Sequence, residues 1–409
     1  MSEWKDVIIG DHVDLISGYA FKSADFLVGK TEDSLPVIKI KNVANGDVNL
    51  NDVVYHKYYS NLEKFLLYKG DVLIAMTGNH PQAETQVVGD VSRYKLKDKS
   101  LLNQRVGKLI VKDETSLDFI YYLFKNDDVR YYLANQSSGS ANQANISKAD
   151  ILGLNLTIPL PLEQTAIASV LSSLDDKIDL LHRQNATLEK MAETLFRQWF
   201  VEEAKEEWEE VRLGSIVEVI NGVSYKSDDL NPSTTAMVTL KSFDRNGGFR
   251  MDGFKEYTGK YKEQHILKEG DLVVAHTDIT QEADVIGNPV MVIGNPKYDI
   301  LVFSMDLVKV ISKDENYSNE FLYLLMKSRE FKEHCLGYSN GSTVLHLSKK
   351  AVPEYEMKLP PNNLINDFSK KVKPLVQKQF RNQTQIRTLT TLRDTLLPKL
   401  MSGEVTVEP

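Results

Sequence analysis

The chain has 409 residues, of which 42% are apolar and 26% charged, values typical of a folded globular protein. A single cysteine excludes an internal disulfide framework, and no apolar run approaches the ~20 residues of a membrane helix. The first residues, MSEWKDVIIG, show no signal peptide, so we expect a cytoplasmic protein. The net charge of −8 argues mildly against a large nucleic-acid footprint, because phosphate contacts call for a basic surface.

The first segment, residues 1–157, is expected to form an α+β domain. The runs Pro36 to Ile40, Val72 to Ala75 and Val106 to Val111 are rich in β-branched residues and are bounded by Gly or Asn, which predicts strands. The stretch from Leu117 to Leu133 carries an aromatic stripe and is predicted to be a helix.

A long helix is predicted in the next segment, residues 158–205. Pro159 and Pro161 precede its first turn, and neither Gly nor Pro interrupts the stretch from Glu163 to Phe200. Such a helix would be roughly 55 Å long. Its core positions recur in steps of four and three residues, the spacing of a heptad seam, and they are Ile167, Leu171, Leu174, Ile178, Leu181, Asn185, Leu188, Ala192, Leu195 and Trp199.

The third segment, residues 206–358, repeats the first. Trp4 to Gly10 recurs as Trp208 to Gly214, an offset of 204, and Lys69 to Ala75 recurs as Glu269 to Ala275, an offset of 200. Matches in this order, with so little drift, indicate a duplicated domain.

The last segment, residues 359–409, is predicted to be a second long helix. Its seam is more polar than the first, and matching seam positions of the two helices are separated by a constant 201 residues. The seam positions are Ile365, Phe368, Val372, Leu375, Gln379, Asn382, Ile386, Leu389, Arg393 and Leu396. Pro374 is expected to kink this helix or to mark an early turn. Because the two seams share one phase, we expect the helices to pair as a coiled coil, with Asn185 fixing the register.

No catalytic constellation is visible. The chain has no G-x-x-x-x-G-K-[S/T] phosphate loop, and its eight histidines show no metal-ligand spacing. Asn295 to Tyr298 resembles the Asn-Pro-Pro-aromatic loop of adenine methyltransferases but lacks the second proline and a Gly-rich partner, so we interpret it as a turn. We therefore expect no catalytic residue, no metal site and no cofactor in this chain.

Polar loops occupy equivalent places in both copies. Loops of Asn, Gln, Ser and Thr can read base edges, although on residue type alone they are ordinary loops, and the nearby lysines either contact phosphates or only face water. The candidate DNA-binding residues are Tyr19, Phe21, Lys22, Lys39, Lys41, Thr77, Asn79, His80, Gln82, Ser140, Asn142, Gln143, Asn145, Tyr225, Lys226, Lys241, His276, Thr277, Asp278, Ser342, Thr343 and His346.

An ordered set of motifs spans the whole chain. The openings at Trp4 and Trp208 share the pattern W…G…[S/N]-G-x-x-[F/Y]-K-S, and the first long helix is entered by P-L-P-L-E-Q at Pro159 to Gln164. The L-E-K-M…L-F helix end and the C-terminal run Leu392 to Val405 complete the set. Together they resemble the specificity subunits of type I restriction-modification systems.

This resemblance implies a fold and a set of partners. It implies an α+β chain with two tandem duplicated target-recognition domains, separated by long helices that pair as an antiparallel coiled coil. Each domain would read one half of a split, asymmetric double-stranded DNA target. The helices would set the spacer between the half-sites and dock two methyltransferase subunits. Restriction subunits would complete the complex, and no membrane would be involved. The partners' cofactors would be S-adenosylmethionine for the methyltransferase and ATP and Mg for the restriction subunit.

The sequence departs from this pattern in two places. The second copy of Pro-Leu-Glu-Gln is Pro361 to Leu364, P-N-N-L, so docking at that end is expected to differ. Asp278, Glu282 and Asp284 would repel phosphate unless they accept from cytosine or serve as structural carboxylates.

Two other functions stay open at this point. One is a tandem-domain scaffold that binds proteins and contacts DNA only incidentally, which the acidic charge and the coiled coil favour. The other is a nuclease or methyltransferase whose motif is not evident from the sequence.

Overall fold

A computed structural model describes residues 4–43, 46–79, 87–137, 144–244, 247–278, 283–341 and 344–407. The chain forms two compact units: unit 1 holds Met1–Leu180 and Ile386–Pro409, and unit 2 holds Leu181–Gln385. Each unit therefore contains one copy of the repeated domain and a part of each long helix.

Unit 1 is built on two four-stranded sheets. One is antiparallel, in the order β2 (Val13–Ser17), β10 (Val106–Val111), β6 (Val72–Ala75), β8 (Val91–Arg93). The other is mixed, in the order β4 (Val54–Lys57), β3 (Ser34–Ile38), β9 (Ser100–Leu102), β5 (Leu66–Leu67). Two strand pairs complete the unit, β1 (Lys5–Ile8) with β12 (Asn155–Ile158) and β7 (Thr77–Gly78) with β11 (Ala144–Asn145). The three predicted strands are thus confirmed as β3, β6 and β10.

The predicted helix from Leu117 to Leu133 is two helices in the structure. Helix α2 (Leu117–Lys125) ends where Asn126 takes an extended conformation, with ψ of 129°. The Asn126 side chain then accepts a hydrogen bond from the Asp128 amide and caps α3 (Asp127–Gln136). Two short helices, α1 (Ile9–His12) and α4 (Lys148–Leu152), complete unit 1.

Unit 2 repeats the order of both four-stranded sheets. The antiparallel sheet runs β14 (Val217–Asn221), β22 (Leu307–Ser312), β18 (Leu272–Ala275), β20 (Pro289–Met291). The mixed sheet runs β16 (Lys255–Glu256), β15 (Thr235–Val238), β21 (Ile300–Phe303), β17 (Ile266–Leu267). The remaining strands are β13 (Glu209–Arg212) paired with β25 (Glu356–Leu359), and β19 (Thr277–Asp278), β24 (Leu345–Leu347) and β23 (Ser339–Asn340) in a three-stranded sheet. Helices α6 (Asn319–Met326) and α7 (Arg329–Gly337) take the places of α2 and α3, and α8 (Ala351–Glu354) that of α4, which confirms the duplication.

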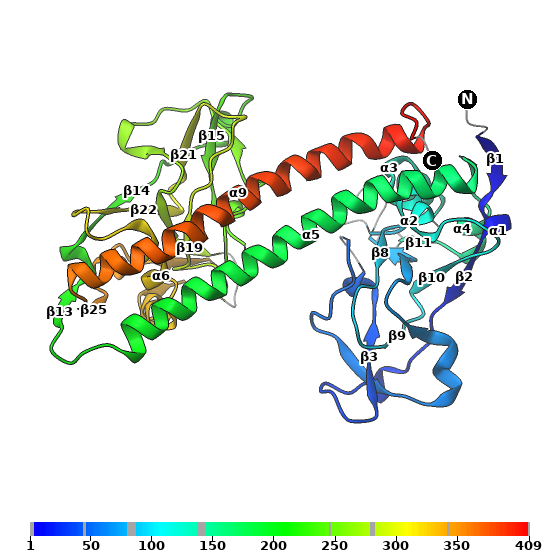
Figure 1. The fold of residues 1–409 in the computed structure, drawn as a ribbon, viewed down its shortest axis with the longest axis horizontal. Helices are drawn as coiled ribbons and strands as arrows, with labels where there is room; N and C mark the ends of the chain where they lie inside the picture. The colour runs from blue at the N-terminus through cyan, green and yellow to red at the C-terminus, as the bar shows by residue number, and fades with distance from the viewer. Residues whose placement is uncertain are drawn as a thin grey trace. The chain divides into compact units, whose positions relative to one another are not determined.

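The two long helices are α5 (Pro161–Arg197), continued by a π-helical turn at Gln198–Glu202, and α9 (Asn362–Met401) (Figure 1). Every predicted seam position is buried or half-buried. Pro374 does not end α9, and the predicted early turn is wrong. Pro374 lies on the exposed face of the helix, where water can satisfy the carbonyl that its missing N–H leaves unbonded.

The helices pair in the antiparallel sense within each unit. In unit 1, Asp175 of α5 contacts Arg393 of α9. In unit 2 the residue numbers move in opposite directions along the pair, from Asn185 with Asn382 to Phe200 with Phe368. The predicted antiparallel coiled coil is confirmed. Asn185 faces a polar partner, because Asn382 Nδ2 donates to its Oδ1 over 2.8 Å, and its role in fixing the register stays a prediction.

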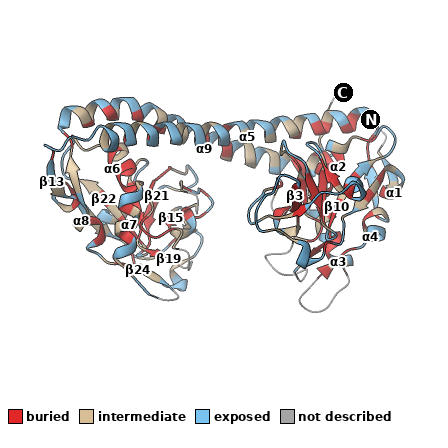
Figure 2. Ribbon diagram, turned by 90° about the horizontal axis from the view of Figure 1, so that it is seen from below, coloured by how far each residue is buried: buried red, intermediate tan, exposed pale blue. Residues whose placement is uncertain are grey.

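Each domain packs its main helix between the antiparallel sheet and the long helices. In unit 1 the core joins the aromatic residues of α2 to Ile167 and Leu171 of α5 and to Leu397 and Leu400 of α9. The equivalent core of unit 2 joins α6 to α5 and α9 through a cluster of rings, Phe196, Phe200, Phe321 and Phe368. Figure 2 shows the buried residues gathered in the interior of each unit. Parts of both long helices therefore belong to the core of each unit.

Candidate nucleic-acid interface

In unit 1, the structure brings together two predicted polar loops that lie far apart in the sequence. Strand β7 pairs with β11, which places Thr77 opposite Asn145, and the Thr77 hydroxyl donates to Asn145 Oδ1 over 2.7 Å. Arg105 Nη1 also donates to Asn145 Oδ1, over 3.4 Å. Asn79 is exposed just beyond β7. These residues form one polar edge of unit 1.

The same edge exists in unit 2 with different side chains. Strand β19 pairs with β24, so that Thr277 lies opposite His346, which is exposed. His276 is half-buried, and this burial lowers the pKa of its imidazole, so that the ring is neutral near pH 7. A neutral imidazole has one donor and one acceptor nitrogen, and the hydrogen bond between the His276 ring and the Ser348 backbone already uses one of them.

A second group of predicted residues lies beside the mixed sheets, in the segments that follow β2 and β3 in unit 1 and β14 and β15 in unit 2. In unit 1, the partly exposed Tyr19 ring packs edge-on against Phe65, at 5.4 Å between centroids, and Lys39 Nζ lies 3.9 Å from the centroid of Phe26. Lys22 and Lys41 are exposed. Burial lowers the pKa of the Lys39 ammonium, and Lys41 acts in the same direction.

The equivalent group in unit 2 is similar. Lys255 Nζ donates to the Tyr225 hydroxyl over 3.0 Å, while Lys226 and Lys241 are exposed. These lysines could meet phosphates without a change of fold, because their side chains already reach solvent.

Four candidate residues are not at the surface, and the structure corrects their roles. Phe21 belongs to the core between Val37 and Leu66, and Thr77 and Thr277 are buried within their strand pairs. Asp278 is only 1% exposed and accepts hydrogen bonds from the backbone amides of Val285 and Ile286, at 2.6 and 2.9 Å. It is a structural carboxylate, one of the two roles left open by the sequence. The candidates His80, Gln82, Ser140, Asn142, Gln143, Ser342 and Thr343 lie outside the described residues.

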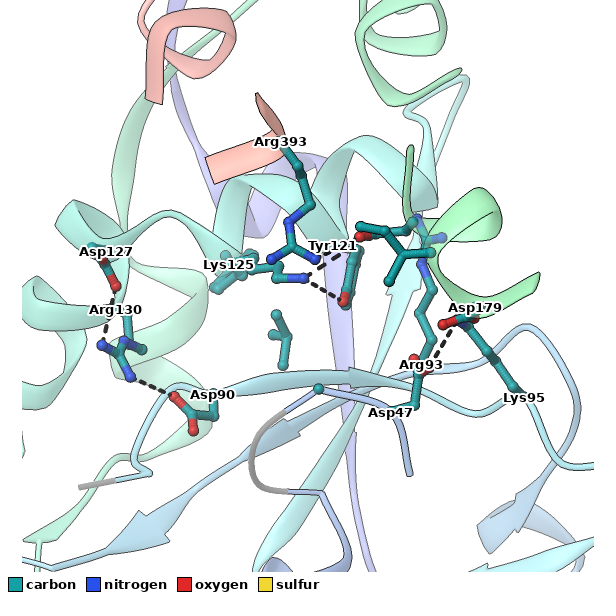
Figure 3. A pocket seen from close by; sticks show the side chains of 15 residues that line it. Asp47, Asp90, Arg93, Lys95, Tyr121, Lys125, Asp127, Arg130, Asp179 and Arg393 are labelled. Carbon is teal, nitrogen blue, oxygen red and sulfur yellow. Dashed lines mark hydrogen bonds and ion pairs between the residues drawn. The ribbon is translucent and has the colours of Figure 1, made fainter. Parts of the chain in front are cut away.

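A charged cavity of about 440 Å³ in unit 1 was not predicted (Figure 3). Five cationic and five acidic side chains line it, and they are Arg93, Lys95, Lys125, Arg130 and Arg393 with Asp47, Asp90, Asp127, Asp175 and Asp179. Lys95 pairs with Asp179 of α5, and Arg393 of α9 pairs with Asp175. Because the charges balance and the cations are paired, this cavity is a cluster of ion pairs that joins the domain to its helices.

Asp175 is the centre of that cluster. It accepts hydrogen bonds from the Tyr122 hydroxyl and from Arg393 Nη1, each over 2.8 Å, and Lys125 Nζ lies 3.9 Å away. Burial raises the pKa of the Asp175 carboxyl, but the positive charges of Lys125 and Arg393 outweigh this effect and hold the pKa below the usual aspartate range.

Unit 2 has a related junction around Glu189 of α5. The Glu189 carboxylate accepts from the Tyr323 hydroxyl over 2.7 Å, from Gln379 Nε2 of α9 over 2.5 Å, and from Lys327. Lys125 and Lys327 occupy the same place in the two repeats. The sequence shows this alignment, but it does not show that each lysine lies near an acidic side chain of α5.

Two further properties of the described residues bear on function. Among the described residues, no group of three or more His, Cys, Asp or Glu side chains is arranged to hold a metal ion. The helices in that part of the chain include none that is long and apolar enough to cross a membrane.

Known proteins with similar sequences and folds share this architecture. The chain is 29% identical to the type I restriction enzyme MjaIX specificity subunit of Methanocaldococcus jannaschii, over 75% of this chain and 73% of that one. It is 24% identical to the HindI specificity subunit of Haemophilus influenzae, over 99% and 100% of the two chains. A crystal structure of the type I restriction-modification S subunit from M. genitalium has the same fold, with a TM-score of 0.60 at 20% identity over 98% of this chain and 96% of that one. The family model for the type I restriction modification DNA specificity domain matches twice, at residues 1–190 and 205–387. The chain therefore belongs to the type I restriction-modification DNA specificity family.

Proposed function

We propose that this chain is the DNA-recognition subunit of a type I restriction-modification complex and reads a bipartite, asymmetric target. Residues 1–157 and 206–358 each read one half-site, and α5 and α9 set the spacer between them. The observation that carries this proposal is that one fold and one family match occur twice in the chain, each time with its core closed by the same pair of antiparallel helices.

The polar edges and the lysine-bearing segments beside the mixed sheets are the surfaces that contact DNA. Side chains of different type occupy equivalent places on the two edges, such as Asn145 in unit 1 and His346 in unit 2. Because different donors and acceptors select different base pairs, the two half-sites differ in sequence. The net charge of −8 implies that partner subunits supply much of the phosphate contact.

The chain has no catalytic activity of its own and acts in the cytoplasm with partners. Two methyltransferase subunits that use S-adenosylmethionine dock on the helical regions, and restriction subunits that use ATP and Mg complete the complex. The support is that similar proteins are named specificity subunits and that the long helices expose apolar side chains, among them Leu162 and Met191 of α5 and Leu392 of α9.

The test is methylation mapping in cells that express this chain with its cognate methyltransferase subunit. We expect one split motif, with two different half-sites and a fixed spacer. Absence of any motif, together with DNA binding that does not weaken as salt rises, would instead favour a protein-binding scaffold, because counterion release makes DNA binding strongly salt-dependent.

A paired deletion tests the role of the helices. Because the pairing is antiparallel, removing residues 182–188 together with 380–386 takes out the Asn185–Asn382 contact as a unit and keeps the remaining partners in register. Each helix loses about 10 Å, the length of about three base pairs. We expect a changed spacer with unchanged half-sites, and changed half-sites with the old spacer would refute this division of labour.

A further inference from the structure

One half-buried cation in unit 2, Lys332, is hydrogen-bonded to a non-helical segment. Lys332 of α7 donates from Nζ to the carbonyl oxygens of Ala283 and Ile286, over 3.0 and 2.5 Å, and to Asn288 Oδ1 over 2.8 Å. The carbonyl of Asp284 lies at 3.5 Å. An ammonium group has three donors, so this arrangement uses all of them on one stretch of chain, residues 283–288.

The segment 283–288 is also tied to the polar edge of unit 2. The Asp278 carboxylate of β19 accepts from two of its backbone amides. Ala275 and Gly287 continue the connection, since the Gly287 amide donates to the Ala275 carbonyl over 2.8 Å. Strand β19, which begins directly after His276, is therefore hydrogen-bonded to the segment that Lys332 contacts.

The backbone of this segment would not keep its shape without help. Ala283 has a φ of +56°, in the left-handed region that non-glycine residues rarely adopt. Gly287 has a φ of +77°, and a Cβ there would lie 2.7 Å from Cys335 Cβ. The Lys332 ammonium gives the carbonyls of Ala283 and Ile286 a hydrogen-bond donor in this conformation, while the carbonyl of Asp284 accepts from Asn288 Nδ2 over 2.8 Å.

Unit 1 has an equivalent contact, in which an arginine of α3 binds a carboxylate. Arg130 of α3 lies 202 residues before Lys332, and its Nη1 donates to Asp90 Oδ1 over 3.1 Å (Figure 3). Asp90 stands where Asn288 stands in unit 2, directly before the equivalent strand β8. The Gly89 amide donates to the Ala75 carbonyl over 2.9 Å, as Gly287 does to Ala275.

We infer that Arg130 and Lys332 are positioning residues for base readout, each for one half-site. Each ties the helix behind the sheet to the segment that supports the polar edge, Lys332 through three oxygens and Arg130 through one carboxylate. Neither side chain has to touch DNA to act in this way. The inference rests on the proposed function, since it names which residues hold the two reading edges in place.

The test uses the two positions as controls for each other. Chains carrying Lys332→Met or Arg130→Met are expressed with the cognate methyltransferase subunit, and methylation is mapped on a library of randomised half-sites. We expect Lys332→Met to lower discrimination at one or more positions of the second half-site by about tenfold and to leave the first half-site unchanged, because one correctly placed contact gives discrimination of that order. Arg130→Met should do the reverse. Arg329→Met, which removes an exposed cation from the same helix α7, should change neither.

The outcomes separate this inference from the proposed function. A wild-type chain that gives no split motif removes the proposed function itself. A split motif in the wild type that stays the same in both variants overturns only the positioning role. Methylation lowered equally at every sequence, with discrimination intact, also overturns it, because that pattern means a loss of folded protein. If Lys332→Met does not fold, Lys332→Gln keeps one donor group and is judged by the same criteria.

Discussion

Replacement of Asp175 by alanine should loosen unit 1 from its helices. The change leaves Arg393, whose side chain is 17% exposed, with only its neighbour Asp394, and removes the 2.8 Å acceptor of the buried Tyr122 hydroxyl. Removing one partner of a buried pair costs ~3–5 kcal/mol, and the remaining Asp394 contact moves the expectation to about 3 kcal/mol. Asp175→Asn keeps an acceptor for Tyr122 and should cost about half as much.

Amide hydrogen exchange is the right assay, because a chain with two units does not unfold in one step. We expect Asp175→Ala to lower the opening free energy of amides in α2 by about 3 kcal/mol and to leave α6 of unit 2 unchanged. Asp176→Ala is the matched control, since Asp176 is the exposed neighbour on the same helix, and it should change either region by less than ~0.5 kcal/mol. A loss below ~1 kcal/mol for Asp175→Ala, or an equal loss for Asp176→Ala, would refute the reasoning.

Three shorter predictions follow from single sites. Cys335 is 0% exposed, and burial raises the pKa of its thiol to about 12. Thiol reagents at pH 8 should therefore modify Cys335 only as unit 2 unfolds, and labelling of the folded protein as fast as that of a free thiol would contradict this. Gly18→Ala places a Cβ 2.2 Å from the Asn103 carbonyl oxygen and should lower the stability of unit 1 by ~2–4 kcal/mol, measured by hydrogen exchange of its amides, whereas Gly29→Ala, which meets open space, should be nearly neutral. Burial raises the pKa of the Glu189 carboxyl, but Lys327 lowers it by more, so the folded-state pKa lies below the usual glutamate value. The stabilising effect of Glu189 is therefore present above pH ~4.5 and is lost as pH falls through the folded-state pKa. Glu189→Gln should remove that part of the acid destabilisation of unit 2, and acid unfolding profiles identical to those of the wild type would argue against it.

The long helices could be predicted from the sequence because their information is local. A seam repeating in steps of four and three residues fixes which side chains face the partner, whatever the rest of the chain does. The duplication could also be predicted from the sequence, because the motifs that begin at Trp4 and Trp208 can be aligned residue by residue. The break at Asn126 was missed, since the aromatic stripe continues across it and only the cap geometry shows that one helix ends and another begins.

The pairing within the polar edges and the contacts that support them could not be predicted, because they depend on contacts between distant residues. Thr77 and Asn145 meet across 68 positions, and Lys332 reaches backbone oxygens 46 to 49 positions away. Residue type alone gave Thr77 and Asp278 as surface candidates, and only the fold shows them buried. An aligned pair of cations, Arg130 and Lys332, was present in the sequence, but Arg130 contacts a carboxylate and Lys332 contacts backbone carbonyls, so the two repeats share no pattern of acceptors.

The central claim is that each domain reads its own half of one DNA target. The direct measurement is methylation mapping, with the cognate methyltransferase subunit, of this chain and of a chimera in which residues 206–358 are exchanged for those of another family member. We expect one split motif in which the exchange changes the second half-site alone. A motif changed in both halves, or not changed at all, would contradict it.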